Sequence, residues 1–157
     1  MNTLKTVLYM GIMHGFFTCY IPYRLSLTNV QVIHLGLFRF AAIFFWLAGT
    51  FLIVWPSVDF VRKGRGTPAH TDPPRELVIS GPYRYMRNPI YLGALFVILG
   101  YVLWFGSFPV LFYLFLFFLA YQVLIVYMEE PILRNTFGMA YREYCQRVPR
   151  WIPKFRP

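Results

Sequence analysis

A stretch of 41 residues without a charged side chain, 88–128, constrains this chain more than any other feature. A polar segment lies at each end of it: RYMRNPIYLG at 84–93 and EEPILRNTFGMAYREYCQRVPR at 129–150. A helix of about 20 apolar residues crosses the roughly 30 Å of hydrocarbon in a membrane. The uncharged stretch therefore predicts two helices in a hairpin, which brings both polar segments to the same membrane surface.

The composition favours a membrane protein over a soluble one. Of 157 residues, 58% are hydrophobic and only 13% are charged, fewer charges than a soluble domain carries. We expect an all-α, polytopic helical bundle with about four spans at 5–23, 35–55, 90–105 and 108–128, the last two joined by a turn at 106–109. We expect a single domain: two spans (1–55), a cytoplasmic loop (56–89), the hairpin (90–128) and a cytoplasmic tail (129–157). The N-terminal segment is interpreted as a retained anchor.

The basic residues predict the orientation. Twelve of the fifteen Lys and Arg residues lie in the 56–89 loop or after position 128, so the positive-inside rule places both termini in the cytoplasm. The net charge of +9 fits loops that rest on anionic lipid. No basic stretch is dense enough to follow a nucleic-acid backbone. Two separated cysteines and three scattered histidines predict neither a disulfide nor a metal site.

The start of the third span is a candidate binding site. Asn88 is a favoured N-cap, and Pro89 at the first helical position costs no hydrogen bond. The exposed N–H groups of such a helix start also favour a carboxylate ligand. Arg84 and Arg87 are equally well explained by orientation or by function.

The acidic pair at the end of the fourth span needs a partner. Glu129 and Glu130 end a long apolar helix, where negative charge opposes the helix dipole. An arginine from the 84–93 segment would satisfy the pair, but we expect at least one of them to bind a cationic or hydroxyl-bearing ligand. Beyond them, the tail predicts an amphipathic surface helix that closes over the site. Its apolar positions at helical spacing are Phe137, Tyr141, Tyr144 and Val148.

These segments resemble a known family. GPYRYMRNPIYLG at 81–93, the EE pair and the tail pattern FGxxYxxYxxxVPR are similar to the isoprenylcysteine carboxyl methyltransferases and the related phospholipid methyltransferases, over 68–151. The resemblance implies transfer of a methyl group from S-adenosylmethionine to a lipid-like or isoprenoid acceptor at the cytoplasmic membrane face. By position it implies a cofactor site of ten residues: Arg75, Glu76, Leu77, Val78, Tyr83, Asn88, Pro89, Ile90, Tyr91 and Glu129. If the acceptor must lose a proton, Glu130 or Tyr144 is the candidate base.

Two positions depart from the family pattern. Asn88 stands where eukaryotic members have His, and Ile125 stands where they place a substrate-orienting Arg. The nucleophile therefore stays open among a carboxylate, an amine, a thiol and a hydroxyl.

Two other classes also stay open: an NADPH-dependent membrane sterol or enone reductase, and a non-enzymatic membrane protein. The predicted spans lack the buried charges that would mark an ion path. A homodimer that completes a lipid cleft is a further alternative.

Overall fold

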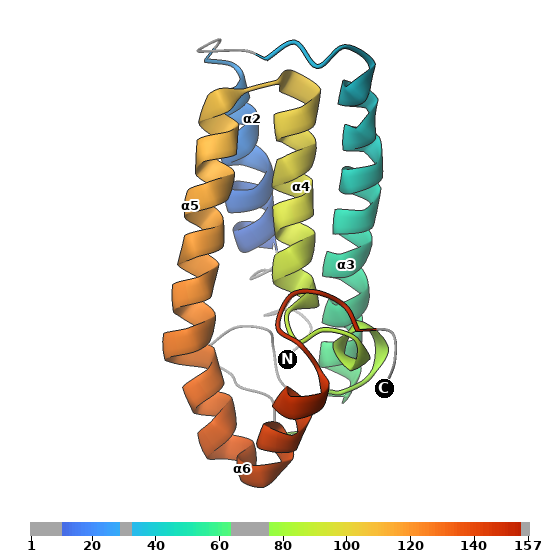
Figure 1. The fold of residues 1–157 in the computed structure, drawn as a ribbon, viewed down its shortest axis with the longest axis vertical. Helices are drawn as coiled ribbons and strands as arrows, with labels where there is room; N and C mark the ends of the chain where they lie inside the picture. Colours follow the sequence, from blue (N-terminus) through green and yellow to red (C-terminus); the bar gives the residue numbers. More distant parts are fainter. Residues whose placement is uncertain (1–10, 29–32, 64–75, 155–157) are drawn as a thin grey trace.

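The computed structural model describes residues 11–28, 33–63 and 76–154. Within these ranges the chain forms helices and no strand, and the long helices run side by side along the longest axis (Figure 1). The helices are η1 (Gly11–Tyr20), α2 (Ile21–Ser26), η2 (Gly36–Phe40), α3 (Ala41–Lys63), η3 (Gly81–Arg84), α4 (Pro89–Phe105), α5 (Phe108–Leu124), η4 (Ile125–Glu129) and α6 (Glu130–Arg147). The prediction of an all-α fold is confirmed for these residues.

Two helical stretches are long and apolar enough to cross a membrane, Gly36–Asp59 and Phe108–Arg147, the second of which includes a kink at Gly138. The apolar helix α4 is shorter, with 17 residues. Of the first predicted span, 5–23, the described part is helical from Gly11. The structure therefore supports two long apolar helices, while the number of four spans stays a prediction.

The predicted hairpin is present. α4 ends at Phe105, Gly106 caps it in the left-handed conformation, and α5 begins at Phe108. The carbonyl of Gly106 accepts a hydrogen bond of 2.7 Å from the N–H of Ile33. Figure 1 shows α4 and α5 running antiparallel from this turn, so the polar segments that flank the hairpin lie toward the same end of the molecule.

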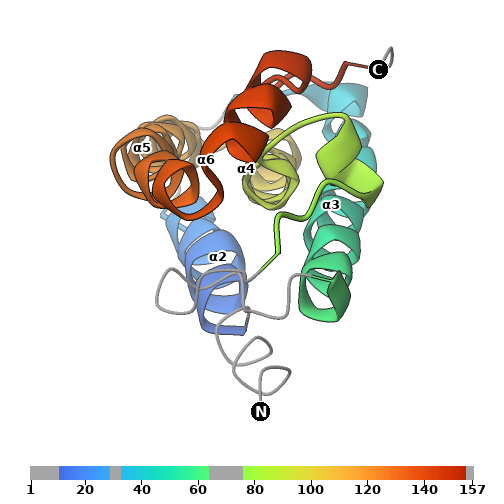
Figure 2. The ribbon, with the colours of Figure 1, turned by 90° about the horizontal axis from the view of Figure 1, so that it is seen from below.

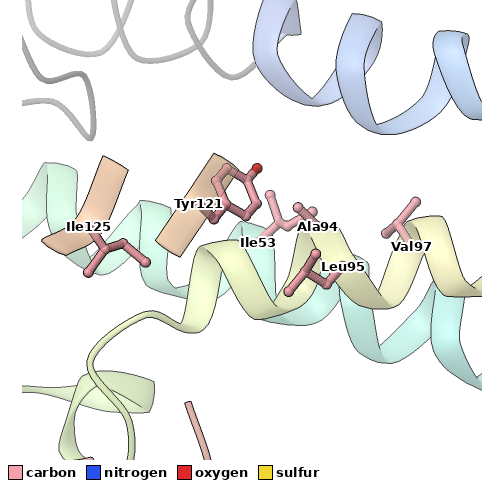
Figure 3. Close-up of a cluster of buried hydrophobic side chains, with 6 residues drawn as sticks. All are labelled: Ile53, Ala94, Leu95, Val97, Tyr121 and Ile125. Atoms are coloured by element: carbon pink, nitrogen blue, oxygen red, sulfur yellow. The ribbon is translucent and has the colours of Figure 1, made fainter. Parts of the chain in front are cut away.

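The core lies between α3, α4 and the end of α5. Its buried cluster, shown in Figure 3, consists of Ile53, Ala94, Leu95, Val97, Tyr121 and Ile125. α3 and α4 approach closely through two glycines, because a Cβ atom on Gly49 would lie 2.7 Å from the carbonyl oxygen of Gly93, and the reverse distance is also 2.7 Å. Small residues at a helix contact are typical of packing in membranes.

The outward faces of the long helices are apolar. Large side chains on α3 and α5 are exposed, among them Phe44 and Leu47 on α3 and Phe112 and Phe115 on α5. An exposed apolar surface of this extent marks contact with lipid or with a partner. The composition of these faces agrees with a body that lies in hydrocarbon.

The tail does not form the single surface helix that the sequence predicts. α6 follows α5 through the π-helical turn η4, and Pro131 lies in the first turn of α6. The chain reverses at Gly138, whose φ of 53° and ψ of −121° are not helical. Figure 1 shows this reversal at the lower end, after which the second half of α6 returns toward the start of α4.

Candidate functional site

The two polar segments meet at the start of α4, as the hairpin predicts. The N–H of Arg87 donates to the carbonyl of Pro149 at 2.9 Å, and the N–H of Lys154 donates to the carbonyl of Tyr85 at 3.0 Å. Figure 2 shows the end of α6 crossing beside the start of α4 and the turn η3. Backbone hydrogen bonds therefore join the tail to the segment that leads into α4.

Asn88 occupies the predicted N-cap position but does not cap. Its side chain makes no hydrogen bond to the first turn of α4, and its Nδ2 instead donates to the carbonyl of Arg150 at 3.3 Å. Pro89 begins the helix as expected. The N–H groups in the first turn of α4 therefore receive no capping hydrogen bond from the Asn88 side chain.

Glu130 is the centre of a buried ion cluster. Its residue is 4% exposed, and its carboxylate contacts three guanidinium groups, those of Arg87 at 3.0 Å, Arg150 at 2.9 Å and Arg134 at 3.3 Å. Arg87 also donates to the sulfur of Cys145 at 2.8 Å. The possibility that an arginine of the 84–93 segment pairs with the acidic residues is thus confirmed for Glu130, which pairs with Arg87. We call these four charged residues the Glu130 cluster.

Glu129 faces a different group. Its Oε1 accepts a hydrogen bond from the hydroxyl of Tyr91 in the first turns of α4. The ring of Tyr91 packs on Tyr121 of α5 with centroids 4.4 Å apart. Tyr121 belongs to the apolar core, together with Ile125 (Figure 3). The Glu129 carboxylate therefore lies where the polar end of the molecule meets its apolar body.

The segment before α4 brings Tyr83 toward the same carboxylate. Burial raises the pKa of Tyr83, and the negative charges of nearby Glu129 and Asp59 raise it further. The hydroxyl of Tyr144 donates to the backbone carbonyl of Tyr83 at 2.7 Å, and burial raises the pKa of Tyr144 as well. Both phenols therefore stay neutral at neutral pH, and Tyr144 serves as a hydrogen-bond donor.

The other predicted site residues divide into three groups. Ile90 is buried at the start of α4, and Val78 is buried in the segment before it. Leu77 is half-buried, and Glu76 is exposed at the edge of the described residues. Arg75 lies outside the described residues.

Ile125 is buried at 1% exposure in the core, so this position offers no charged group to an acceptor. In the described part of the chain, no three His, Cys, Asp or Glu side chains are grouped to hold a metal ion. A cavity of about 340 Å³ lies at the opposite end of α4, among residues 33–36, Arg39 and 103–106, away from Glu129.

Sequence reasoning missed two residues of this end. Asp59 near the end of α3 accepts a hydrogen bond of 3.1 Å from Ser80, and it is the first acidic residue of the chain, at the end of a long apolar run. A lone acidic residue at the end of an apolar run indicates a polar partner or a functional role, so the sequence did contain a signal for Asp59. Arg150 has no local signal in the sequence beyond its positive charge, because its partner Glu130 lies 20 positions away.

Among the described residues, the fold and the joined polar segments define a helical protein with an apolar body and a polar end at the start of α4. The chain matches the model of the phospholipid methyltransferase family over residues 32–140, and it belongs to this family of methyltransferases. The resemblance stated from the sequence is thereby confirmed. An uncharacterized protein of Haemophilus influenzae is 33% identical over 63 residues, which are 40% of this chain and all of that protein. No solved structure matches the chain.

Proposed function

We propose that the protein transfers a methyl group from S-adenosylmethionine to a lipid-like or isoprenoid acceptor at the cytoplasmic membrane surface. The observation that carries the proposal is the pairing of Glu129 with Tyr91, where the polar end meets the apolar helices. Membership of the phospholipid methyltransferase family supplies the reaction class. Apolar outer faces on α3 and α5 suit a lipid that approaches from the side.

The donor set at this end fits the cofactor. The Glu129 carboxylate suits an ammonium group or ribose hydroxyls, and the first N–H groups of α4 suit a carboxylate. Arg87 adds a buried Nε that has no hydrogen-bond partner among the described residues. Aromatic faces such as those of Tyr83 and Tyr91 suit a sulfonium cation. Buried Val78 and Ile90 supply apolar walls.

The chain's own residues would act mainly by alignment. S-adenosylmethionine, when bound, supplies a methyl group on an electrophilic sulfonium centre. An in-line displacement depends strongly on the geometry of the reacting groups. The Glu130 cluster holds the end of η4 against the start of α4 and so fixes where Glu129 lies. The neutral hydroxyl of Tyr144 holds the backbone carbonyl of Tyr83 by a hydrogen bond without adding charge.

A base is needed only when the acceptor must lose a proton. Tyr144 already donates its own proton to the carbonyl of Tyr83, and its raised pKa opposes ionisation. Glu130 is occupied by three arginines. Their contacts support positioning roles for both residues, and an acceptor that enters already deprotonated or as a neutral amine needs neither as a base.

The test is calorimetric titration of the detergent-purified protein with S-adenosylhomocysteine. Glu129→Gln keeps the size of the side chain but removes its charge, so we expect the dissociation constant to rise by about 10- to 100-fold, as for a lost charged hydrogen bond. Glu143→Gln is the matched control, because Glu143 is exposed on α6 and pairs only at the surface with Arg147.

NADPH is titrated in parallel. Binding of NADPH without S-adenosylhomocysteine would replace the proposal with the reductase alternative. A folded, monodisperse sample that binds neither compound would support a non-enzymatic protein.

A further inference from the structure

Asp59 is the first charged residue of α3, which carries no charged side chain from Ala41 to Val58. It lies four positions before the last residue of α3 and is half-buried. Its Oδ2 accepts a hydrogen bond of 3.1 Å from the hydroxyl of Ser80, 21 positions later in the chain. A carboxylate removed from water needs such partners, because an uncompensated buried charge is strongly unfavourable. The contact therefore joins α3 to the turn η3.

The backbone of this turn lies directly against the same carboxylate. A Cβ atom built on Gly81 would lie 2.6 Å from Oδ2 of Asp59 and 3.4 Å from Nε1 of Trp55. Gly81 also has a φ of 56°, which side chains disfavour. The positive φ favours glycine at this position, and a Cβ atom here would also displace the carboxylate end of Asp59. The backbone of the turn at Gly81 therefore lies close to the Asp59 carboxylate.

The turn carries Tyr83 and is held from two sides. The N–H of Tyr83 donates to the carbonyl of Ser80 at 3.2 Å, within the turn. Asp59 holds the turn from α3, and the hydroxyl of Tyr144 holds the carbonyl of Tyr83 from α6 at 2.7 Å. Figure 2 shows the turn lying between these two helices, beside the start of α4.

We infer that Asp59 is a positioning residue, which acts through Ser80 and Gly81 to place the turn as a wall of the cofactor pocket. It does so without touching the cofactor. This inference rests on the proposed function, because the wall matters to binding only if the cofactor lies beside Tyr83 and Glu129. Its physical basis is the contact of one carboxylate with both the side chain and the backbone of the turn.

The experiment uses three variants, Asp59→Ala, Asp59→Asn and Ser80→Ala, with Glu143→Gln as the control for loss of a carboxylate. Asp59→Ala and Ser80→Ala should each weaken S-adenosylhomocysteine binding by about tenfold, as for one lost hydrogen bond to a charged acceptor. Asp59→Asn should stay within about threefold of the wild type, because its amide oxygen still accepts from Ser80. The double variant Asp59→Ala/Ser80→Ala should lose less affinity than the sum of the two single losses, because both single variants remove the same hydrogen bond.

Hydrogen exchange without ligand gives a second readout. The amides of Tyr83, Tyr85 and Met86 are hydrogen-bonded within the turn. Asp59→Ala and Ser80→Ala should speed their exchange by about tenfold, and Glu143→Gln should not change it. Unchanged exchange of the α4–α5 hairpin shows that the variants remain folded.

The outcomes separate the two proposals. If Asp59→Asn binds as weakly as Asp59→Ala, the charge of Asp59 meets the ligand itself, and the positioning role is overturned. Unchanged turn exchange in Asp59→Ala, or additive effects in the double variant, also overturns it. If the wild-type protein does not bind S-adenosylhomocysteine, the proposed function and the pocket wall fail together, while exchange still decides whether Asp59 fixes the turn.

Discussion

Glu130→Gln is expected to destabilise the folded protein by about 3 kcal/mol, the lower end of the cost of breaking a buried ion pair. The structure indicates which contact dominates. Arg134 is 57% exposed and pairs at i,i+4 spacing, so it contributes only a few tenths of a kcal/mol. Arg150 is 31% exposed, whereas Arg87 is 13% exposed and lies 3.0 Å from the carboxylate. The main cost is therefore the charge of Arg87, left buried without its partner.

The assay is the apparent thermal unfolding midpoint in detergent. For a chain of this size each kcal/mol corresponds to about 2–4 °C, so Glu130→Gln should lower the midpoint by about 6–12 °C. The control Glu143→Gln should shift it by no more than about 1 °C, because Glu143 and Arg147 are 58% and 78% exposed.

A second variant isolates the unpaired charge. Adding Arg87→Met to Glu130→Gln removes the buried guanidinium, and should recover about half of the lost midpoint. Equal midpoints for Glu130→Gln and Glu143→Gln, or no recovery in the double variant, would refute the reasoning.

Two further predictions concern the tail and the phenols. Gly138→Ala should lower the free energy of unfolding by about 1–3 kcal/mol, because Gly138 has a φ of 53° and a ψ of −121°. Protease cleavage of the tail should therefore accelerate, and an unchanged cleavage rate would contradict this prediction. Burial raises the pKa of Tyr83, Tyr141 and Tyr144 above the ordinary value of 10, so the folded state retains protons that the unfolded state loses. Their contribution to stability is complete below about pH 10 and is lost as the pH rises further. Tyrosinate absorbance should therefore show late titration of these phenols, and ordinary titration of all tyrosines before unfolding would argue against their burial.

The parts of the fold that the sequence predicted correctly follow from one long-range constraint. An uncharged stretch with a turn at 106–109 can only return to its starting side, so the hairpin and the meeting of the polar segments needed no knowledge of side-chain contacts. The sequence did not identify which arginine pairs with Glu130, because that choice depends on side-chain contacts. Charge balance indicates that a buried carboxylate needs a cation, but not which one.

The errors arose where local rules compete with distant partners. Asn88 is placed as an N-cap should be, yet its amide donates to the carbonyl of Arg150, 62 positions away. No local pattern encodes that contact. At Gly138 the apolar spacing from Phe137 to Val148 continues across the reversal, so periodicity alone predicted one helix.

The two adjacent glutamates divide their roles by helix geometry. Successive side chains on a helix point about 100° apart, so Glu130 faces the arginines while Glu129 faces Tyr91. The N–H of Glu130 bonds to the carbonyl of Ile125, a wider π-type turn that alters the helical register just before the pair.

Both partners come from one short stretch, since Arg87 precedes α4 and Tyr91 lies in its first turns. Glu130 joins the end of η4 to the start of α4 by a buried ion pair, whereas Glu129 contributes a hydrogen bond from Tyr91. Replacing Glu130 should consequently lower both stability and cofactor affinity, whereas replacing Glu129 should lower affinity while the unfolding midpoint stays near that of the wild type.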